Sequence, residues 1–241
     1  MMTTKQEHVA ILGGSSGIGL AAAKRLRSEG KKVTIAGRDP ARLERARIEI
    51  GDDIETKSFD ATDLFKIHAF FRELGAFDHL VLTFGGGKGF GPFATLSIDE
   101  LRLGFEHKAW AYLACAQAAL ETIRRDGSIT FISAVSSQMA APGTVGLAAI
   151  NGALDAAART LANEARPLRV NTVSPGVIDT EWWGGFPEER RREVFAQYAA
   201  KSPAGRVGAA DDIASAISFL ISNSFITGHI LTCDGGLRLA A

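Results

Sequence analysis

Short apolar runs alternate with longer stretches of helical period along almost the whole chain. The runs are rich in Val, Ile and Leu, and the stretches between them are rich in Ala, Leu, Arg and Glu. This alternation is typical of strand–helix–strand units, in which a parallel sheet is covered by helices on both faces. We predict strands at residues 8–13, 32–37, 54–58, 78–84, 127–133, 167–174 and 229–233, and helices at residues 19–29, 40–51, 98–125, 147–164 and 210–223.

The predicted fold is an α/β fold, a Rossmann-type doubly wound parallel sheet of about seven strands. With 241 residues, of which 46% are hydrophobic and 22% charged, the chain is long enough for one well-buried domain and short for two. We therefore expect residues 1–241 to form a single domain. The only long irregular insertion is residues 184–208, with a short helix expected at 188–200.

Charge and cysteine content exclude several functions. The chain has 27 Lys and Arg against 27 Asp and Glu, so no net field attracts nucleic acid or a membrane surface. Cys115 and Cys233 lack metal-site spacing, and we expect no metal. Residues 127–154 are uncharged, but their Ser, Gly, Pro and Asn exclude a membrane span. Residues 1–8 lack the apolar core of a signal peptide, so we expect a cytoplasmic protein.

A glycine-rich loop follows the first predicted strand and leads directly into a helix. Its sequence is Gly-Gly-Ser-Ser-Gly-Ile-Gly at residues 13–19. In this context the first glycine allows a tight turn, the middle one lets the backbone approach a pyrophosphate, and the last lets the helix pack on the strand. An ordinary glycine-rich turn is the alternative. The loop predicts dinucleotide binding through Gly13, Ser15, Ser16, Gly17, Ile18 and Gly19.

The end of the second predicted strand indicates which dinucleotide binds. An acidic residue here would repel a ribose 2′-phosphate, whereas a guanidinium pairs with its oxygens. The strand ends in Gly37 and Arg38, so we expect NADP(H) rather than NAD(H). Asp39 tempers this preference. The alternative is that Arg38 is a solvated charge at a turn.

Further motifs resemble the short-chain dehydrogenase/reductase family over essentially the whole chain. They are Phe-Asp-Ala-Thr-Asp at 59–63, Arg-Val-Asn-Thr-Val-Ser-Pro-Gly at 169–176 with a later Thr, Gly-Arg-Val-Gly at 205–208, Thr-Gly at 227–228 and Asp-Gly-Gly at 234–236. The resemblance implies a substrate lid at 184–208 and a homotetramer. It also implies further cofactor contacts at Asp60, Ala61, Gly85, Pro175, Gly176, Ile178 and Thr180.

The chain departs from this family at every position that handles protons. The family pairs Tyr with Lys one helical turn later, so that the ammonium lowers the Tyr pKa and holds the nicotinamide ribose. Here Leu147 and Asn151 occupy those two positions. The family's substrate-binding Ser is replaced by Ala134, and its water-anchoring Asn by Lys108. The catalytic residues are therefore unknown.

Few other residues can replace the missing acid. Neither Tyr112 nor Tyr198 precedes a Lys by four positions. Lys108 could act with a pKa depressed by burial, although filling the space of the missing ammonium is the simpler interpretation. On a helix His107 points about 100° away from Lys108, so we expect it outside the pocket.

Three other features have structural alternatives. Residues 133, 136 and 137 are Ser with no His or Asp partner of a hydrolytic triad. The Gly-Gly-Gly-Lys-Gly segment at 85–89 lacks the phosphate-loop pattern and is expected to be a loop at the cofactor cleft. Trp182, Trp183 and Phe186 indicate an apolar ligand contact, with core or subunit packing as an equal alternative.

Two functions follow from these observations. The first is an NADP(H)-dependent oxidoreductase that acts on an apolar carbonyl compound or alcohol by a non-standard mechanism; an activated alkene or quinone would need no side-chain acid. The second is a catalytically silent nucleotide-binding protein that serves as a sensor, a scaffold or a partner subunit. In both, Ala-rich helical faces at residues 109–120 and 147–161 are expected to form a homo-oligomer, a tetramer by the family resemblance.

Overall fold

A seven-stranded parallel sheet forms the centre of the computed structural model, which describes residues 6–240. The strand order is β3-β2-β1-β4-β5-β6-β9. The predicted polar start of the chain lies mostly at residues 1–5, outside the described part. The strands are β1 (His8–Leu12), β2 (Lys32–Gly37), β3 (Glu55–Ser58), β4 (Phe77–Leu82), β5 (Ile123–Ile132), β6 (Arg169–Pro175) and β9 (Ile230–Cys233).

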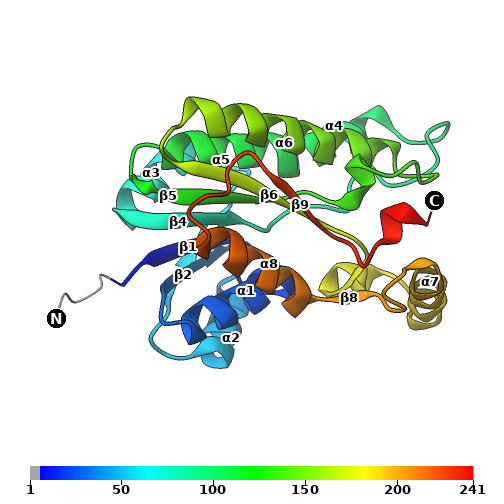
Figure 1. Ribbon diagram of the computed structural model, residues 1–241, viewed down its shortest axis with the longest axis horizontal. Helices are drawn as coiled ribbons and strands as arrows, with labels where there is room; N and C mark the ends of the chain where they lie inside the picture. The colour runs from blue at the N-terminus through cyan, green and yellow to red at the C-terminus, as the bar shows by residue number, and fades with distance from the viewer. Residues whose placement is uncertain (1–5, 241) are drawn as a thin grey trace.

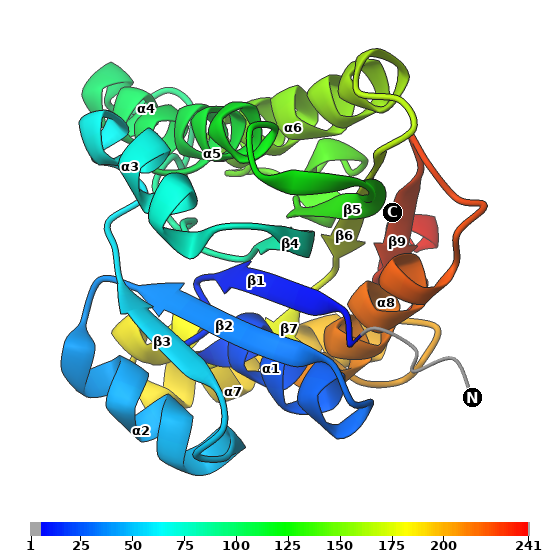
Figure 2. The same cartoon turned by 90° about the vertical axis from the view of Figure 1, so that its left-hand side faces the viewer.

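Helices cover both faces of this sheet, as Figure 2 shows. One layer holds α1 (Gly17–Ser28), α2 (Pro40–Ile50) and α8 (Ala210–Ser222). The other holds α3 (Leu64–Leu74), α4 (Ile98–Gly104), α5 (Ala111–Ala119) and α6 (Val145–Glu164). The prediction of a Rossmann-type doubly wound sheet is confirmed, whereas α3 was not predicted.

The core is divided between the two faces because side chains alternate along each strand. In β1, Val9 and Ile11 pack toward the layer that contains α1. Ala10 and Leu12 pack toward the layer that contains α5. All four are essentially inaccessible to solvent. A strand buried on both faces needs a continuous apolar run, which is why the sequence pattern located it.

The predicted helix at residues 98–125 is present as far as Ala119, and its predicted end is wrong. The segment divides into α4, a π-helical turn at Phe105–Trp110 and α5, and then β5 begins at Ile123. Ile123 pairs with Phe77 ahead of a register shift in the ladder. Residues 124–126, which are charged and exposed, lie in this irregular start of β5. Because they lack the apolar character of a strand, the pattern assigned them to the preceding helix.

The predicted insertion lies beyond the carboxyl ends of the central strands (Figure 1). The short helix expected at 188–200 is present as α7 (Glu188–Lys201). It follows a 3-10 turn at Glu181–Gly185. The strands β7 (Ile178–Asp179) and β8 (Gly208–Ala209), which were not predicted, pair with each other on either side of it. This pairing fixes both ends of the insertion beside the sheet.

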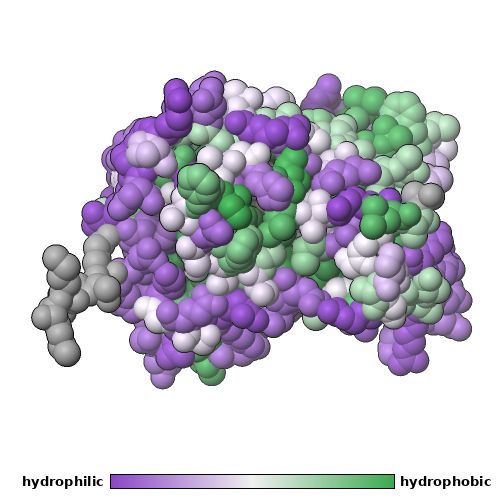
Figure 3. All heavy atoms as spheres, in the orientation of Figure 1, coloured by the Kyte–Doolittle hydropathy of each residue, from purple (hydrophilic) through white to green (hydrophobic). Residues whose placement is uncertain are grey.

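The last strand of the sheet, β9, has one neighbour, β6. On the face seen in Figure 3, apolar residues gather in the middle of the molecule, over the region of α8 and β9.

Within residues 6–240, none of the helices combines the length and the apolar character that crossing a bilayer requires.

Candidate cofactor and substrate cleft

A cleft of about 1100 Å³ opens at the carboxyl ends of β1 and β4. The strand order reverses between these two strands, and open α/β sheets bind ligands at such a point. Every residue predicted to contact a dinucleotide lines this cleft except Gly19. The lining residues from that prediction are Gly13, Ser15, Ser16, Gly17, Ile18, Arg38, Asp60, Ala61, Gly85, Pro175, Gly176, Ile178 and Thr180.

Two glycines of the loop after β1 allow close backbone packing. Gly13 has a φ of +91°, and a Cβ there would lie 2.7 Å from the backbone nitrogen of Phe84. A Cβ on Gly19 would overlap the carbonyl oxygen of Gly13. Thr83 closes the same junction, because its Oγ1 donates a 3.0 Å hydrogen bond to the carbonyl oxygen of Leu12. Gly19 therefore packs the start of α1 against Gly13 and does not line the cleft, although it was also predicted to contact the dinucleotide.

The residues at this loop fit a dinucleotide. Ser16, the N-cap of α1, makes no side-chain capping bond, so the first N–H groups of the helix remain available to a phosphate. Asp39 caps α2 by accepting hydrogen bonds of 2.8 and 3.2 Å from the backbone nitrogens of Ala41 and Arg42. The exposed Arg38 and the capping carboxylate of Asp39 both line the cleft at the end of β2.

A second cation at this end of the cleft was not predicted. Arg42 lines the cleft from the first turn of α2, and its guanidinium lies 3.5 Å from the Glu181 carboxylate. The sequence could have indicated it, because Arg42 is one turn of helix beyond Arg38. Two guanidiniums near the end of β2 strengthen the case for a site that holds a phosphate.

The opposite end of the cleft contains a buried lysine that contacts the helix α6. The Lys108 ammonium donates a 2.7 Å hydrogen bond to Oδ1 of Asn151 and a 3.3 Å one to the carbonyl oxygen of Ser133. Asn151 is held in turn, since its Nδ2 donates to Oγ of Ser136 at 3.2 Å and to the carbonyl oxygen of Leu147 at 2.8 Å. Lys108 and Asn151, the two positions whose charge differs from the family pattern, are therefore hydrogen-bonded to each other.

The π-helical turn brings Lys108 into the cleft. Burial lowers the pKa of Lys108 to about 8, while the carboxylate of Asp155 opposes this shift. A π turn holds more residues than an α turn, so adjacent residues on it diverge by less than 100°. His107 lines the same cleft as Lys108. The expectation that His107 lies outside the pocket is therefore wrong.

Two buried polar atoms near Lys108 have no hydrogen-bond partner within the described part of the chain. They are Oγ of Ser133 and Oδ1 of Asp155. The other oxygen of Asp155 accepts a 2.6 Å hydrogen bond from Ser137. Ser133 lines the cleft and Asp155 does not. The Ser133 hydroxyl is thus an unused polar group at the cleft wall, with no histidine paired to it.

The remaining altered positions also meet here. Ala134 and Leu147 both line the cleft, and neither carries a hydroxyl. The hydroxyl of Tyr112 donates to the carbonyl oxygen of Phe84 at 3.0 Å, and burial raises its pKa well above the ordinary value. Tyr112 is therefore a core residue. Tyr198 lines the cleft from α7, which the sequence did not indicate because its position depends on how the insertion folds.

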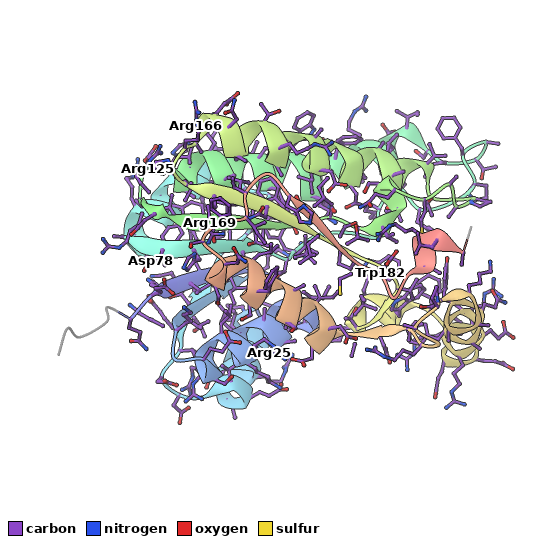
Figure 4. The ribbon with its side chains drawn as sticks, in the orientation of Figure 1. Arg25, Asp78, Arg125, Arg166, Arg169 and Trp182 are labelled. Carbon is purple, nitrogen blue, oxygen red and sulfur yellow. The ribbon has the colours of Figure 1, made fainter. Side chains whose placement is uncertain are left out.

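Aromatic residues of the insertion and of the 3-10 turn before it pack against one another beside the cleft. Trp183 contacts Phe186 and Phe195 at ring-centroid distances of 5.2 and 5.3 Å. Trp182 packs on Trp183 at 4.7 Å, and a Cβ on Gly86 would lie 3.4 Å from its indole nitrogen. Figure 4 labels Trp182 at the end of the sheet where β7 and β8 lie. The indole of Trp182 therefore bridges the insertion and the loop after β4.

Lys88, the cation of the glycine segment 85–89, is not placed to bind a phosphate in the cleft. Its ammonium lies 3.1 Å from the carboxylate of Glu100. Gly85, Gly86 and Gly87 line the cleft, whereas Lys88 does not.

Across residues 6–240, no cluster of His, Cys, Asp and Glu has the composition of a metal site.

Comparisons with known proteins agree on one family. Residues 13–238 match the family described as Enoyl-(Acyl carrier protein) reductase. A short-chain dehydrogenase/reductase, ATR9, from Stachybotrys chlorohalonatus is 33% identical over 99% of this chain and 100% of its own length. Carbonyl reductase family member 4 from Xenopus laevis is 31% identical over 95% of this chain and 97% of its own length.

Solved structures give the same result. A small-chain dehydrogenase crystallised in complex with NADPH has a TM-score of 0.87 and 33% identity, and the match covers 98% of this chain and 100% of that one. A short-chain dehydrogenase/reductase from Brucella melitensis has a TM-score of 0.88 at 26% identity, with 96% of each chain covered.

Proposed function

The chain belongs to the short-chain dehydrogenase/reductase family, and from this premise we propose that it is an NADP(H)-dependent oxidoreductase that acts on an apolar carbonyl compound or alcohol. The main observation in support is one cleft that is lined both by the glycine loop with Arg38 and by apolar side chains such as Leu147 and Met139. The NADPH in the similar crystal structure supports the same cofactor.

NADP(H) would be held along the length of this cleft. The loop residues Ser15 to Ile18 would receive the pyrophosphate at the start of α1, and Arg38 with Arg42 would bind the 2′-phosphate. Asp60 and Ala61 would contact the adenine, and the segment from Pro175 to Thr180 the nicotinamide. The bound cofactor would supply or accept a hydride at its nicotinamide ring.

Apolar side chains form part of the wall of the proposed substrate compartment. Phe90, Met139, Leu147 and Trp182 line it, together with Tyr198 from α7. Residues 184–208 act in this proposal as the lid over that compartment, since Phe186 packs on Trp182, whose indole lies against the loop after β4. Side chains such as these exclude water from a reacting substrate.

Ordinary ketone reduction should be slow in this cleft. The alkoxide formed by hydride addition needs a proton, and a positioned acid contributes about a hundred- to ten-thousand-fold in rate. Ala134 and Leu147 supply no hydroxyl at the cleft wall. Activated alkenes and quinones, whose reduction depends less on such an acid, are therefore the better substrates to test.

The absence of hydroxyls at residues 134 and 147 also favours a second candidate. A nucleotide-binding protein without turnover, acting as a sensor, a scaffold or a partner subunit, would keep the cofactor cleft and lose the acid. This alternative predicts tight NADPH binding with no consumption of NADPH for any substrate class.

The two candidates are separated by one pair of measurements. Calorimetric titration with NADPH and NADH tests the cofactor, and we expect NADPH to bind more tightly. NADPH oxidation is then followed with ketones, activated alkenes and quinones. Turnover of alkenes or quinones supports the oxidoreductase, whereas binding without any turnover supports the silent protein. Fast ketone turnover that survives Lys108→Ala and Ser133→Ala would contradict our account of the missing acid.

A further inference from the structure

The charge of Lys108 is not balanced by a contact. Both acceptors of its ammonium are neutral, namely the Asn151 amide and the Ser133 carbonyl. An ammonium has three N–H donors, so these two bonds leave one N–H free. Only 8% of Lys108 is exposed, so water compensates little of this charge. A buried cation without a paired anion is costly, and a ligand can supply the missing charge.

The nearest protein charge does not fill this role. Asp155 is one helical turn beyond Asn151 on α6 and acts on Lys108 through space. Within residues 6–240, Lys108 has no carboxylate at ion-pair distance. One oxygen of Asp155 is bound by Ser137, and the residue lies outside the cleft wall. The cleft is therefore the direction from which an anion can reach Lys108.

A second donor lies beside Lys108. Ser133 is 3% exposed and lines the cleft, and its Oγ has no hydrogen-bond partner in the described chain. Its backbone carbonyl oxygen accepts a hydrogen bond from Lys108, so the two residues are direct neighbours at the cleft wall. One cation with one hydroxyl donor suits an oxygen that carries negative charge.

We propose that Lys108, with Ser133, is the anion-binding group of the substrate compartment, and that the substrate is an apolar compound with an anionic oxygen, a carboxylate or an enolate. This inference rests on the proposed function, because it names the class of substrate for the same cleft. Leu147, Met139 and Trp182 provide the apolar walls. A ligand with an apolar body and one charged oxygen matches both parts of the compartment.

The test compares two probes of the same shape and different charge. Naphthalene carboxylate and the neutral naphthalene carboxamide are titrated calorimetrically into protein saturated with NADP⁺. We expect the carboxylate to bind about ten- to a hundredfold more tightly, as for a hydrogen bond to a charged group. Lys108→Met should abolish this preference. Lys88→Met is the matched control, because Lys88 is paired with Glu100 outside the cleft lining, and it should keep the preference.

Several results would overturn the proposal. One is a carboxylate that binds the wild-type protein no more tightly than the carboxamide, including no binding of either probe. This comparison needs no variant, so it stands even if Lys108→Met does not fold; Lys108→Gln provides a second neutral variant. A preference that persists in a folded Lys108 variant also contradicts the proposal. NADP⁺ binding is measured in the same titrations, so a failure of the cofactor assignment is seen separately from a failure of the anion site.

Discussion

The Lys108 ammonium lies 2.7 Å from Oδ1 of Asn151, across a sequence separation of 43 residues. Lys108 comes from the π-helical turn ahead of α5, and Asn151 from the second turn of α6. Both side chains are buried, and the amide of Asn151 is fixed by its own bonds to Ser136 and Leu147. The cleft therefore tolerates one cation at this point and positions it through a neutral partner.

A second lysine should not be accepted beside the first. Asn151→Lys would place two ammoniums where one is already unpaired, and we expect the free energy of unfolding to fall by about 3–5 kcal/mol. Adding Lys108→Asn to this variant restores one ammonium and one amide, and should recover most of the loss. Urea unfolding of the two single variants and the double variant measures the coupling. Additive effects would show that the two side chains do not interact.

Stability should depend on pH through Lys108. Burial lowers its pKa from 10.5 to about 8 in the folded protein. Between these values the unfolded chain holds a proton that the folded protein has released, so the free energy of unfolding rises with pH in this window. Relative to Lys108→Met, the wild-type protein should gain about 3 kcal/mol from pH 8 to 10.5. Parallel curves for the two proteins would show that Lys108 titrates normally.

Arg38 should determine the choice of cofactor. Removing a guanidinium from a phosphate costs a charge-assisted hydrogen bond, so Arg38→Ala should weaken NADPH binding by about ten- to a hundredfold and leave NADH binding unchanged. Arg45→Ala is the control, because Arg45 is an exposed α2 residue outside the cleft lining. Micromolar binding of NAD(H) by the wild-type protein, with no measurable binding of NADP(H), would remove this role from Arg38.

Two glycines with similar φ angles should respond differently to alanine. Gly30 has a φ of +82° and open space around it, so Gly30→Ala should cost about 1 kcal/mol of backbone strain. Gly13 has a φ of +91° and would place its Cβ against the backbone of Phe84, so Gly13→Ala should cost about 1–3 kcal/mol more. Chemical denaturation measures both. Equal costs would mean that the junction of β1 and β4 can relax.

The chain should form a homo-oligomer through the faces of α5 and α6. Trp110 is 54% exposed next to the start of α5, and such a large side chain at a helix face favours contact with another subunit. Light scattering at micromolar concentration should give a mass above that of one chain, with a tetramer expected. Trp110→Glu should reduce that mass. A monomeric wild-type protein would refute the expectation.

Much of the fold could be predicted because the core strands are apolar on both faces. The strands β1, β2, β4 and β6 lie within two residues of their predicted positions. The glycine loop was located by the same reasoning, since its position after the first strand is a property of the chain itself. The local sequence pattern was sufficient to locate a strand where burial is uniform along that strand.

The rest depended on contacts between distant segments. The sequence showed that Lys108 stands where the family has Asn and that Asn151 stands where the family has Lys. It did not show that the two side chains are hydrogen-bonded. The π turn that places Lys108 has no propensity signal in Phe105–Trp110. Tyr198 and Arg42 entered the cleft lining through the way that α7 and α2 pack, which hydrophobic periodicity does not encode.

The wide turn at Phe105–Trp110 holds more residues than an α-helical turn would. Deleting one residue from it would return the segment to a regular α-helical pitch, so that a different residue can occupy the place of Lys108 in the turn. A charge can therefore be moved out of this crevice by shortening the chain, with no side chain exchanged. Loss or gain of a single codon in this stretch is a direct route by which related genes could diverge in what they bind.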